Sequence, residues 1–269
     1  MAERIDGIRA KVQRAKENFA WLLQSHAEFM DLNPYGVVLD ENPDARLRVW
    51  RARVSAPPPA YWSLVAGDIV HNLRSSLDFV AFQLWDVNGR TGVREDGVYF
   101  HVFPHKPQRT PPDPPKIEAA RHRVVNELGA SAAAIWDRLQ PYRAGDSYEA
   151  HPLYVLHHLD IWDKHRLLNL NVYAVESQQG FIGGPGEHVH IEHLASLPGG
   201  IHGPLADGAV LQSLTLGADT PQVEMEVKFT LHITFEQGGP GRGKPLVKTL
   251  DDLISFVDEA ITKFAPLVD

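Results

Sequence analysis

Hydrophobic residues recur at helical spacing over most of the first 168 positions of the chain. Pro57-Pro58-Pro59 precedes one of these periodic stretches, and Pro152 suits the first turn of another, since proline is tolerated there. Two shorter stretches, at residues 46–54 and 98–103, are typical of strands. The helices that the spacing predicts lie at about residues 3–30, 60–86, 116–128, 131–139 and 152–168.

The pattern changes from helical to alternating after Asn169. Hydrophobic and polar residues alternate from Val223 to Phe235, which predicts a long strand with one buried face. Segments near 170–176, 187–194 and 208–216 are expected to pair around it, and residues 248–265 return to helical spacing. This order predicts an α+β fold, in which a helical layer packs on an antiparallel sheet and a C-terminal helix closes the structure.

The same order predicts how the chain is divided. Residues 1–168 should form a mainly helical part, and residues 169–269 should form the antiparallel sheet with the C-terminal helix. The two parts are compatible with a single domain, because a chain of 269 residues is long enough for one large core or two small ones.

Two of the predicted helices carry more charge than their apolar surroundings explain. In the helix at 60–86, a polar stripe is flanked by aromatic residues; the stripe consists of His71, Arg74, Ser75 and Asp78. The helix at 152–168 is also apolar on most sides. Helices of this kind are normally buried, and an unpaired buried charge is very costly, so we expect the two helices to pack together with His71 near Asp163. The polar residues of the second helix are Asp160, Asp163, Lys164 and His165.

Two interpretations of this helix pair remain open. In the first, Arg74 pairs with Asp160 or Asp163, and the charges fix the helix register of a non-catalytic binding or assembly protein. In the second, the groups converge to bind an anion or to move protons, as in an RNase-like or other acid–base hydrolase. The residues of that hydrolase site would be His71, Arg74, Asp78, Asp163 and His165.

Three motifs resemble those of a family of bacterial proteins that has no assigned function. The family shares His-Asn-Leu-Arg-Ser-x-Leu-Asp, Leu-Gln-Pro-Tyr and Asp-Lys-His-Arg in this order. Here they are residues 71–78, 139–142 and 163–166, so the resemblance covers most of the chain. It implies no particular reaction, cofactor or partner.

The first motif is also distantly similar to the helical HEPN ribonucleases, in which an arginine is followed four to six residues later by a histidine. Arg74 matches the arginine, but the next positions are Phe79, Val80 and Ala81, which cannot transfer protons. Arg94 and His101 have the spacing in a region that is not predicted to be helical. The resemblance therefore lacks the residue that would carry the ribonuclease chemistry.

Composition limits the possible partners. The chain has no cysteine, which excludes disulfides and thiolate zinc sites and favours the reducing cytoplasm. A net charge of -8 argues against broad non-specific nucleic-acid binding. No apolar run is long enough for a transmembrane helix, and the first residues lack the pattern of a signal peptide, so we expect no membrane partner. An oligomer is compatible with the sequence.

Two weaker patterns suggest ligands. On a strand, His188, His190 and Glu192 would share a face, as metal ligands do in cupin-like barrels, but the further glutamate of that family is missing. The alternative is a polar sheet face. Residues 238–245 have the spacing of a phosphate-binding loop, but Pro245 replaces the hydroxyl residue that binds magnesium, so a strand-to-helix loop is the simpler interpretation.

Overall fold

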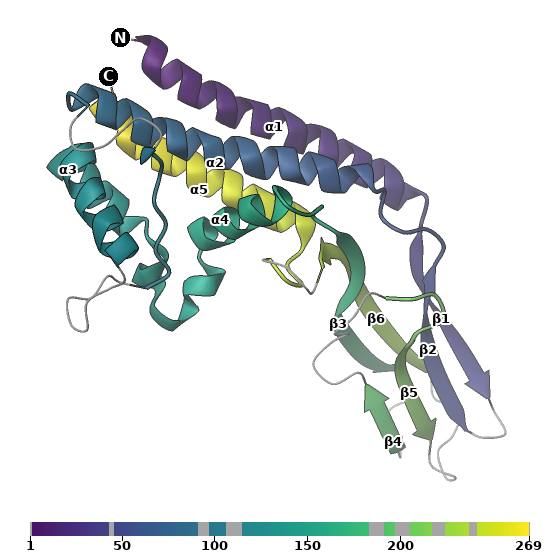
Figure 1. Cartoon of the computed structure of the whole chain (residues 1–269). Helices are drawn as coiled ribbons and strands as arrows, with labels where there is room; N and C mark the ends of the chain where they lie inside the picture. The colour runs from purple at the N-terminus through teal and green to yellow at the C-terminus, as the bar shows by residue number, and fades with distance from the viewer. Residues whose placement is uncertain are drawn as a thin grey trace.

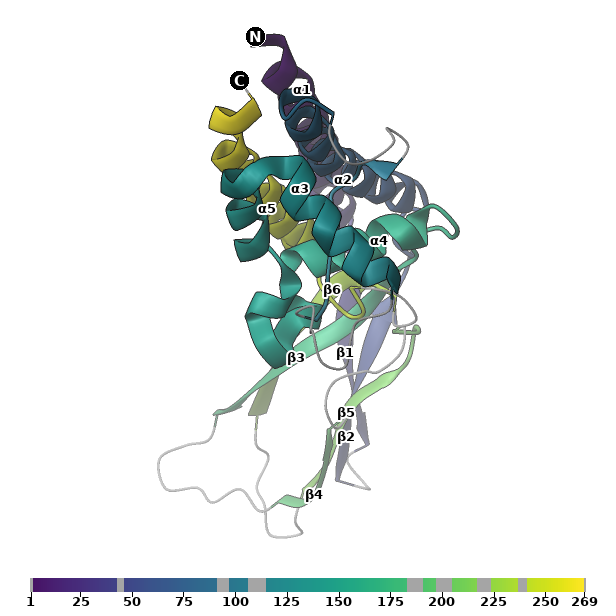
Figure 2. The ribbon, with the colours of Figure 1, turned by 60° about the vertical axis from the view of Figure 1, so that its left-hand side comes forward.

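A computed structural model describes residues 2–42, 46–90, 97–105, 115–182, 191–196, 205–216, 224–236 and 241–268. The fold is α+β, with helices that pack against small antiparallel sheets and a C-terminal helix, as the sequence predicted. In Figures 1 and 2 the long helices lie side by side, both termini are at one end of this bundle, and the sheets lie at the other end. The helices are α1 (Ala2–Asp31), α2 (Tyr61–Val87), α3 (Pro115–Arg138), η2 (Pro141–Ala150), α4 (Pro152–Asp163) and α5 (Leu246–Val268).

The bundle is built on apolar faces that the sequence pattern identified. On α2, the residues of the predicted apolar face are buried without exception, including Ala66, Leu73 and Leu84. On α5 the predicted face is buried from Leu250 to Phe264. Helix α5 belongs to the second part of the chain, after the division expected at residue 168. It nevertheless packs against α1, α2 and α4, which belong to the first part. The last helix therefore contributes to the same hydrophobic core as the first two.

The strands form two antiparallel sheets and not one. They are β1 (Tyr35–Asn42), β2 (Leu47–Val54), β3 (Leu170–Ile182), β4 (Ile191–Ser196), β5 (Val210–Leu216) and β6 (Glu224–Phe235). One sheet has the order β1-β2-β5-β4, and the other contains β3 and β6. The expectation that all three preceding segments pair around the long strand was wrong for β4 and β5: β5 pairs with β2, and β4 pairs with β5.

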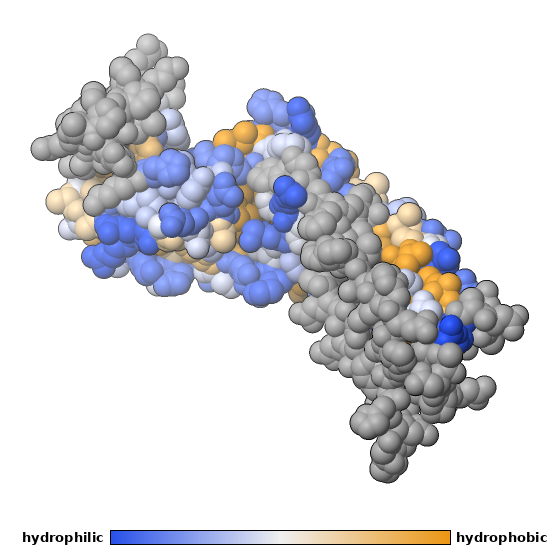
Figure 3. All heavy atoms as spheres, turned by 90° about the horizontal axis from the view of Figure 1, so that it is seen from below, coloured by the Kyte–Doolittle hydropathy of each residue, from blue (hydrophilic) through white to orange (hydrophobic). Residues whose placement is uncertain are grey.

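The faces of β6 agree with the alternating pattern only in part. Ile233 and Phe235 are buried as predicted. Thr234 was expected on the exposed face, but it is completely buried, because the end of β6 is covered by the chain at Pro245. At the end of the molecule that holds the sheets, Figure 3 shows hydrophobic residues beside hydrophilic ones on the surface. Exposed apolar residues of the four-stranded sheet include Val38, Leu39 and Val210.

The predicted strand at 98–103 is wrong. The segment is not in a sheet, although Phe100 and Phe103 are buried in the core. Its main chain is held by side chains: Phe103 N donates to Gln140 Oε1 over 2.9 Å, and the carbonyl of His101 accepts from Trp136 Nε1 over 2.9 Å and from Gln140 Nε2 over 3.2 Å. Buried main-chain groups need partners, and here buried polar side chains take the place of a neighbouring strand.

The helices expected at 116–128 and 131–139 are both present in α3, where a kink at Gly129, with a φ of 76°, separates them. One helix boundary differs from the prediction. Helix α4 begins as expected, with Pro152 in its first turn and the His151 side chain accepting a hydrogen bond from Leu153 N. It ends at Asp163, five residues before the predicted end, so His165 lies in the turn that follows.

Candidate functional site

The helices α2 and α4 pack against each other, as the sequence predicted, and bring the two charged segments together. His71 Nδ1 lies 3.2 Å from Asp160 Oδ1. One turn earlier on α2, Gly67 faces the carboxyl group of Asp163 so closely that a Cβ at position 67 would lie 2.6 Å from Oδ2. Helices in contact have axes about 8–10 Å apart, and the glycine allows an unusually close approach at this crossing. His71 and Asp163 thus belong to one polar cluster.

Arg74 and Asp78 turn inward and bind the main chain of Phe100. Arg74 Nη2 donates to the Phe100 carbonyl over 2.7 Å, and Asp78 Oδ1 accepts from Phe100 N over 2.8 Å. The two side chains also form an ion pair of 2.9 Å, one helical turn apart. Only 5% of the Arg74 side chain is exposed. We call these three residues the Phe100 clamp; the expectation that Arg74 pairs with Asp160 or Asp163 was wrong, and its partner is on its own helix.

The carboxyl group of Asp78 is held in an unfavourable environment for charge. Burial raises its pKa, and the neighbouring Arg74 guanidinium and the Phe100 N–H act in the opposite direction. Removing a carboxylate from water disfavours its charged form unless opposite charges and hydrogen bonds compensate. The clamp supplies both kinds of compensation, which is the arrangement expected of a structural ion pair.

His71 and Lys164 turn outward and share Asp160. Lys164 Nζ lies 2.6 Å from Asp160 Oδ2, while His71 takes the other carboxyl oxygen. The Asp160 side chain is 3% exposed, whereas His71 is 54% and Lys164 53% exposed. A buried carboxylate therefore orients two groups that reach solvent, and its own two oxygen atoms are both occupied.

Ser75 extends this arrangement to a chain of three residues. Its Oγ lies 3.3 Å from His71 Nε2, one turn along α2, so the order is serine, histidine, carboxylate. Catalytic triads are recognised by this geometry and not by sequence position. Ser75 belongs to the predicted polar stripe on α2 but was not among the predicted site residues; the signal was the spacing of four residues between a histidine and a serine on a helix.

The carboxyl group of Asp163 lies on the open side of the cluster, in surroundings that disfavour its negative charge. Burial against α2 raises its pKa, the negative charges of Asp160 and Asp68 raise it further, and His71 acts in the opposite direction. Three carboxyl groups thus meet near one histidine and one lysine. A cationic group placed here would relieve the repulsion between them.

His157 lies between the clamp and the open cluster, and sequence reasoning did not select it as a site residue. Burial, followed by the positive charge of Arg74, lowers its pKa to about 4. Its Nδ1 atom is buried, and no described residue offers it a hydrogen bond. His157 is therefore a neutral ring near neutral pH, and charges of both groups, Arg74 on one side and Asp160 with Lys164 on the other, act on it.

The remaining predicted residues do not join the cluster. His165 is exposed in the turn after α4, and within the described residues its side chain has no hydrogen bond or ion pair. His188 and His190 lie outside the described residues. In the part of the chain that the structure describes, no group of three or more histidine and acidic side chains could hold a metal ion.

Comparisons with protein-family models, curated proteins and solved structures found no match to this chain. Among the helices in the described ranges, none has the length and apolarity needed to cross a membrane. The interpretation of the polar cluster therefore depends on its geometry.

Proposed function

We propose that this chain is a non-catalytic binding or assembly protein of the cytoplasm, and that its partner contacts the exposed side of α2 and α4. The observation that carries the proposal is the Phe100 clamp: Arg74 and Asp78, two of the residues expected in a hydrolase site, are engaged with the main chain of their own protein. The groups that face solvent, among them His71 and Lys164, are already oriented by the buried Asp160. We define this α2–α4 surface by Leu64, Asp68, His71, Ile161, Asp163 and Lys164.

The composition of the α2–α4 surface favours a partner that presents a basic side chain next to apolar ones. Leu64, within one turn of Asp68, is 59% exposed, and Ile161, one turn before Lys164, is 42% exposed. Apolar side chains around a charged centre are typical of protein interfaces. An arginine or lysine of the partner would offset the repulsion that raises the pKa of Asp163. The net charge of -8 favours such a partner over nucleic acid.

Site-specific photocrosslinking tests the proposal. A crosslinker at position 64 should capture a basic protein partner, whereas one at Leu32, which is 77% exposed in the turn after α1, should not. With the partner identified, Asp163→Lys should weaken binding by at least ~10-fold, because it places like charges together. The control Asp31→Lys reverses an exposed charge at the end of α1 and should have no such effect. Equal capture at positions 32 and 64, or unchanged binding by Asp163→Lys, would overturn the proposal.

A hydrolase is the second candidate, and the chain of Ser75, His71 and Asp160 is the observation that favours it. In that function Asp160 orients the ring of His71, and His71 Nε2 accepts the proton of Ser75 Oγ as the serine attacks a carbonyl carbon. Acyl transfer also needs donors for the developing oxyanion. Ser75 lies in the middle of α2, where main-chain N–H groups are used in the helix, so Lys164 would have to take this role. Because main-chain donors for the oxyanion are lacking beside Ser75, the hydrolase is the second candidate.

Labelling with a fluorophosphonate, which reacts with activated serines, separates the two candidates. A hydrolase should be labelled at Ser75, and both Ser75→Ala and His71→Ala should abolish the label. Ser25→Ala is the control, because Ser25 is also on the surface of a helix but pairs with Tyr61 and Trp62. Incubation with RNA, with and without a chelator, tests the ribonuclease version. A binding protein should show neither labelling nor cleavage.

A further inference from the structure

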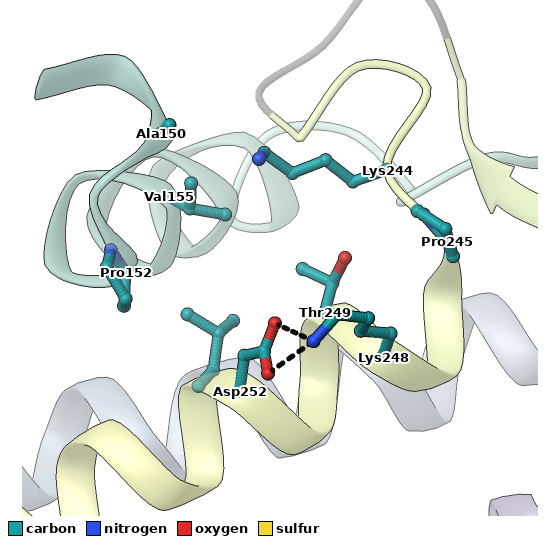
Figure 4. A pocket seen from close by; sticks show the side chains of 9 residues that line it. Ala150, Pro152, Val155, Lys244, Pro245, Lys248, Thr249 and Asp252 are labelled. Carbon is teal, nitrogen blue, oxygen red and sulfur yellow. Dashed lines mark hydrogen bonds and ion pairs between the residues drawn. The ribbon is translucent and has the colours of Figure 1, made fainter. Parts of the chain in front are cut away.

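A second candidate site lies away from the α2–α4 surface, in a cavity of about 150 Å³ at the start of α5. Figure 4 shows the cavity between the first turns of α5 and the region where η2 passes into α4. Its apolar walls include Pro152, Val155 and Leu253. Lys244, Lys248 and Thr249 bring polar groups to it.

Thr249 is the observation that points to a ligand. The residue is only 7% exposed, it lines the cavity, and in Figure 4 its hydroxyl points away from the axis of α5 toward the side where Lys244 extends. Among the described residues its hydroxyl has no hydrogen-bond partner; the Thr249 main-chain N donates to the Pro245 carbonyl over 3.0 Å. The hydroxyl is open to the cavity and is not engaged by any described residue, so it can hydrogen-bond a group bound there.

The charges around the cavity favour an anion. Lys248 Nζ is bound by both carboxyl oxygens of Asp252, at 3.0 Å each, so this pair is neutral. Lys244 adds a positive charge, and within the described ranges no carboxylate is paired with it. Helix α5 begins at Leu246 and points its first N–H groups toward the preceding loop, which adds positive potential there.

The loop that carries Lys244 is fixed before any ligand binds. Gly241 and Gly243 have φ angles of 80° and 66°, which glycine adopts without strain. Gly243 N donates to the carbonyl of Phe235 over 3.1 Å, and Phe235 N donates to the carbonyl of Lys244 over 3.1 Å. The main chain of Lys244 is thus tied to the end of β6. A tied main chain reduces the entropy that would be lost on binding.

We propose that this cavity binds a small organic anion, with its oxyanion head between Lys244 and the Thr249 hydroxyl and its apolar part against Val155 and Leu253. The loop at 238–245 has the spacing of a phosphate-binding loop without the hydroxyl at position 245. Thr249 offers a hydroxyl one turn further along the helix, which suits direct binding of the anion without magnesium. A carboxylate and a phosphate both carry negatively charged oxygen atoms that can accept hydrogen bonds from Lys244 and Thr249. The site is independent of the function proposed for the α2–α4 surface.

Isothermal titration of the full chain tests the site with inorganic phosphate and with butyrate, each against chloride at equal ionic strength. At least one of the two should bind, and which one binds identifies the head group. Lys244→Gln should weaken binding at least ~10-fold, because a charge-assisted hydrogen bond is lost. Thr249→Val, which keeps the shape, should weaken it about 5-fold through loss of one neutral hydrogen bond.

The matched control is Lys263→Gln, which removes an α5 lysine that is engaged with Glu259 and does not line the cavity. It should bind the anion as tightly as the unchanged chain. Circular dichroism of each variant establishes that the helices are retained. The proposal is overturned if neither anion produces heat beyond the chloride reference, or if Lys244→Gln and Lys263→Gln bind equally well.

Discussion

The Phe100 clamp and the α2–α4 surface are drawn from the same short motif, yet they behave as opposite kinds of site. Arg74 and His71 are three residues apart on α2, but their side chains are 5% and 54% exposed. The clamp satisfies the main chain of a segment that has no neighbouring strand. The open cluster does the reverse, since a buried carboxylate, Asp160, serves two groups at the surface.

The difference shows that charge density in a helix does not by itself identify a reaction site. A rotation of less than one turn decides whether a charged side chain faces the core or solvent. A charged side chain that faces the core must be paired and hydrogen-bonded, so its partners define its role. Arg74 is therefore explained by Phe100 and Asp78, whereas His71 remains accessible to a partner or substrate.

Arg74→Ala should produce the largest loss of stability, because it removes the clamp's only positive charge. The partly buried carboxylate of Asp78 would lose its ion-pair partner, and the Phe100 carbonyl would lose its donor. Breaking a buried pair in this way costs about 3–5 kcal/mol. Denaturant unfolding measures the loss. The control Arg14→Ala disrupts an exposed ion pair with Glu17 on α1 and should cost under about 1 kcal/mol.

The same experiment can contradict the distinction between a structural clamp and an accessible α2–α4 surface. Functional sites hold unfavourable charge, and removing such charge is often neutral or stabilising. If Arg74→Ala costs no more than Arg14→Ala, Arg74 belongs with the open cluster, and the hydrolase that uses it becomes the better explanation.

Most helices could be predicted because their information is local. The apolar faces of α2 and α5 repeat at helical spacing, and the residues that form them are buried. Strand partners are not local. The alternation in β6 predicts a strand, but nothing in it specifies that β3 is its partner and that β5 joins β2. Strand β1 was missed because it is an edge strand with exposed Val38 and Leu39, so it lacks a clear burial pattern.

The candidate site could be located from sequence, but its internal pairing could not. The excess of charge on two apolar helices predicts that they meet, and His71 does contact Asp160. The inward bonds of Arg74 and Asp78 depend on where Phe100 passes, and the pattern of residues 98–103 predicted a strand and not a segment held against α2. Likewise, Gln140 lies in a recognisable motif, but its bonds to the main chain at 101–103 require the folded arrangement of α3.

His157 should make stability depend on pH, since it lies between the two regions in a neutral form. Its pKa is about 4 in the fold and near 6.5 in the unfolded chain. Above about pH 6.5 neither state is protonated at this ring. As the pH falls from about 6.5 to 4, the unfolded chain takes up a proton that the folded chain excludes, so the fold loses about 2 kcal/mol.

Unfolding free energies measured from about pH 7.5 to 4.5 test this dependence. His157→Gln should flatten the curve in that range, because the substituted residue does not titrate. The control His165→Gln changes an exposed histidine and should leave the slope unaltered. A slope that is the same in His157→Gln as in the unchanged chain would show that groups other than His157 cause it.

Gly67→Ala should give the smallest effect and the most specific test of the open cluster. Glycine within a helix usually costs about 1 kcal/mol relative to alanine, so the substitution would ordinarily stabilise the protein. At position 67 the new methyl group would lie within 2.7 Å of Asp163 Cγ and displace the carboxyl group. We expect the two effects to offset or to leave a loss of up to about 1 kcal/mol.

Gly7→Ala on α1 is the matched control, since nothing lies within 4 Å of its added methyl group, and it should stabilise the protein. Combining Gly67→Ala with Asp163→Ala should recover the stabilisation seen for Gly7→Ala, because the obstructing carboxyl group is removed. If Gly67→Ala alone stabilises as much as Gly7→Ala, the carboxyl group of Asp163 does not rest on α2, and the α2–α4 surface is less defined than the clamp beneath it.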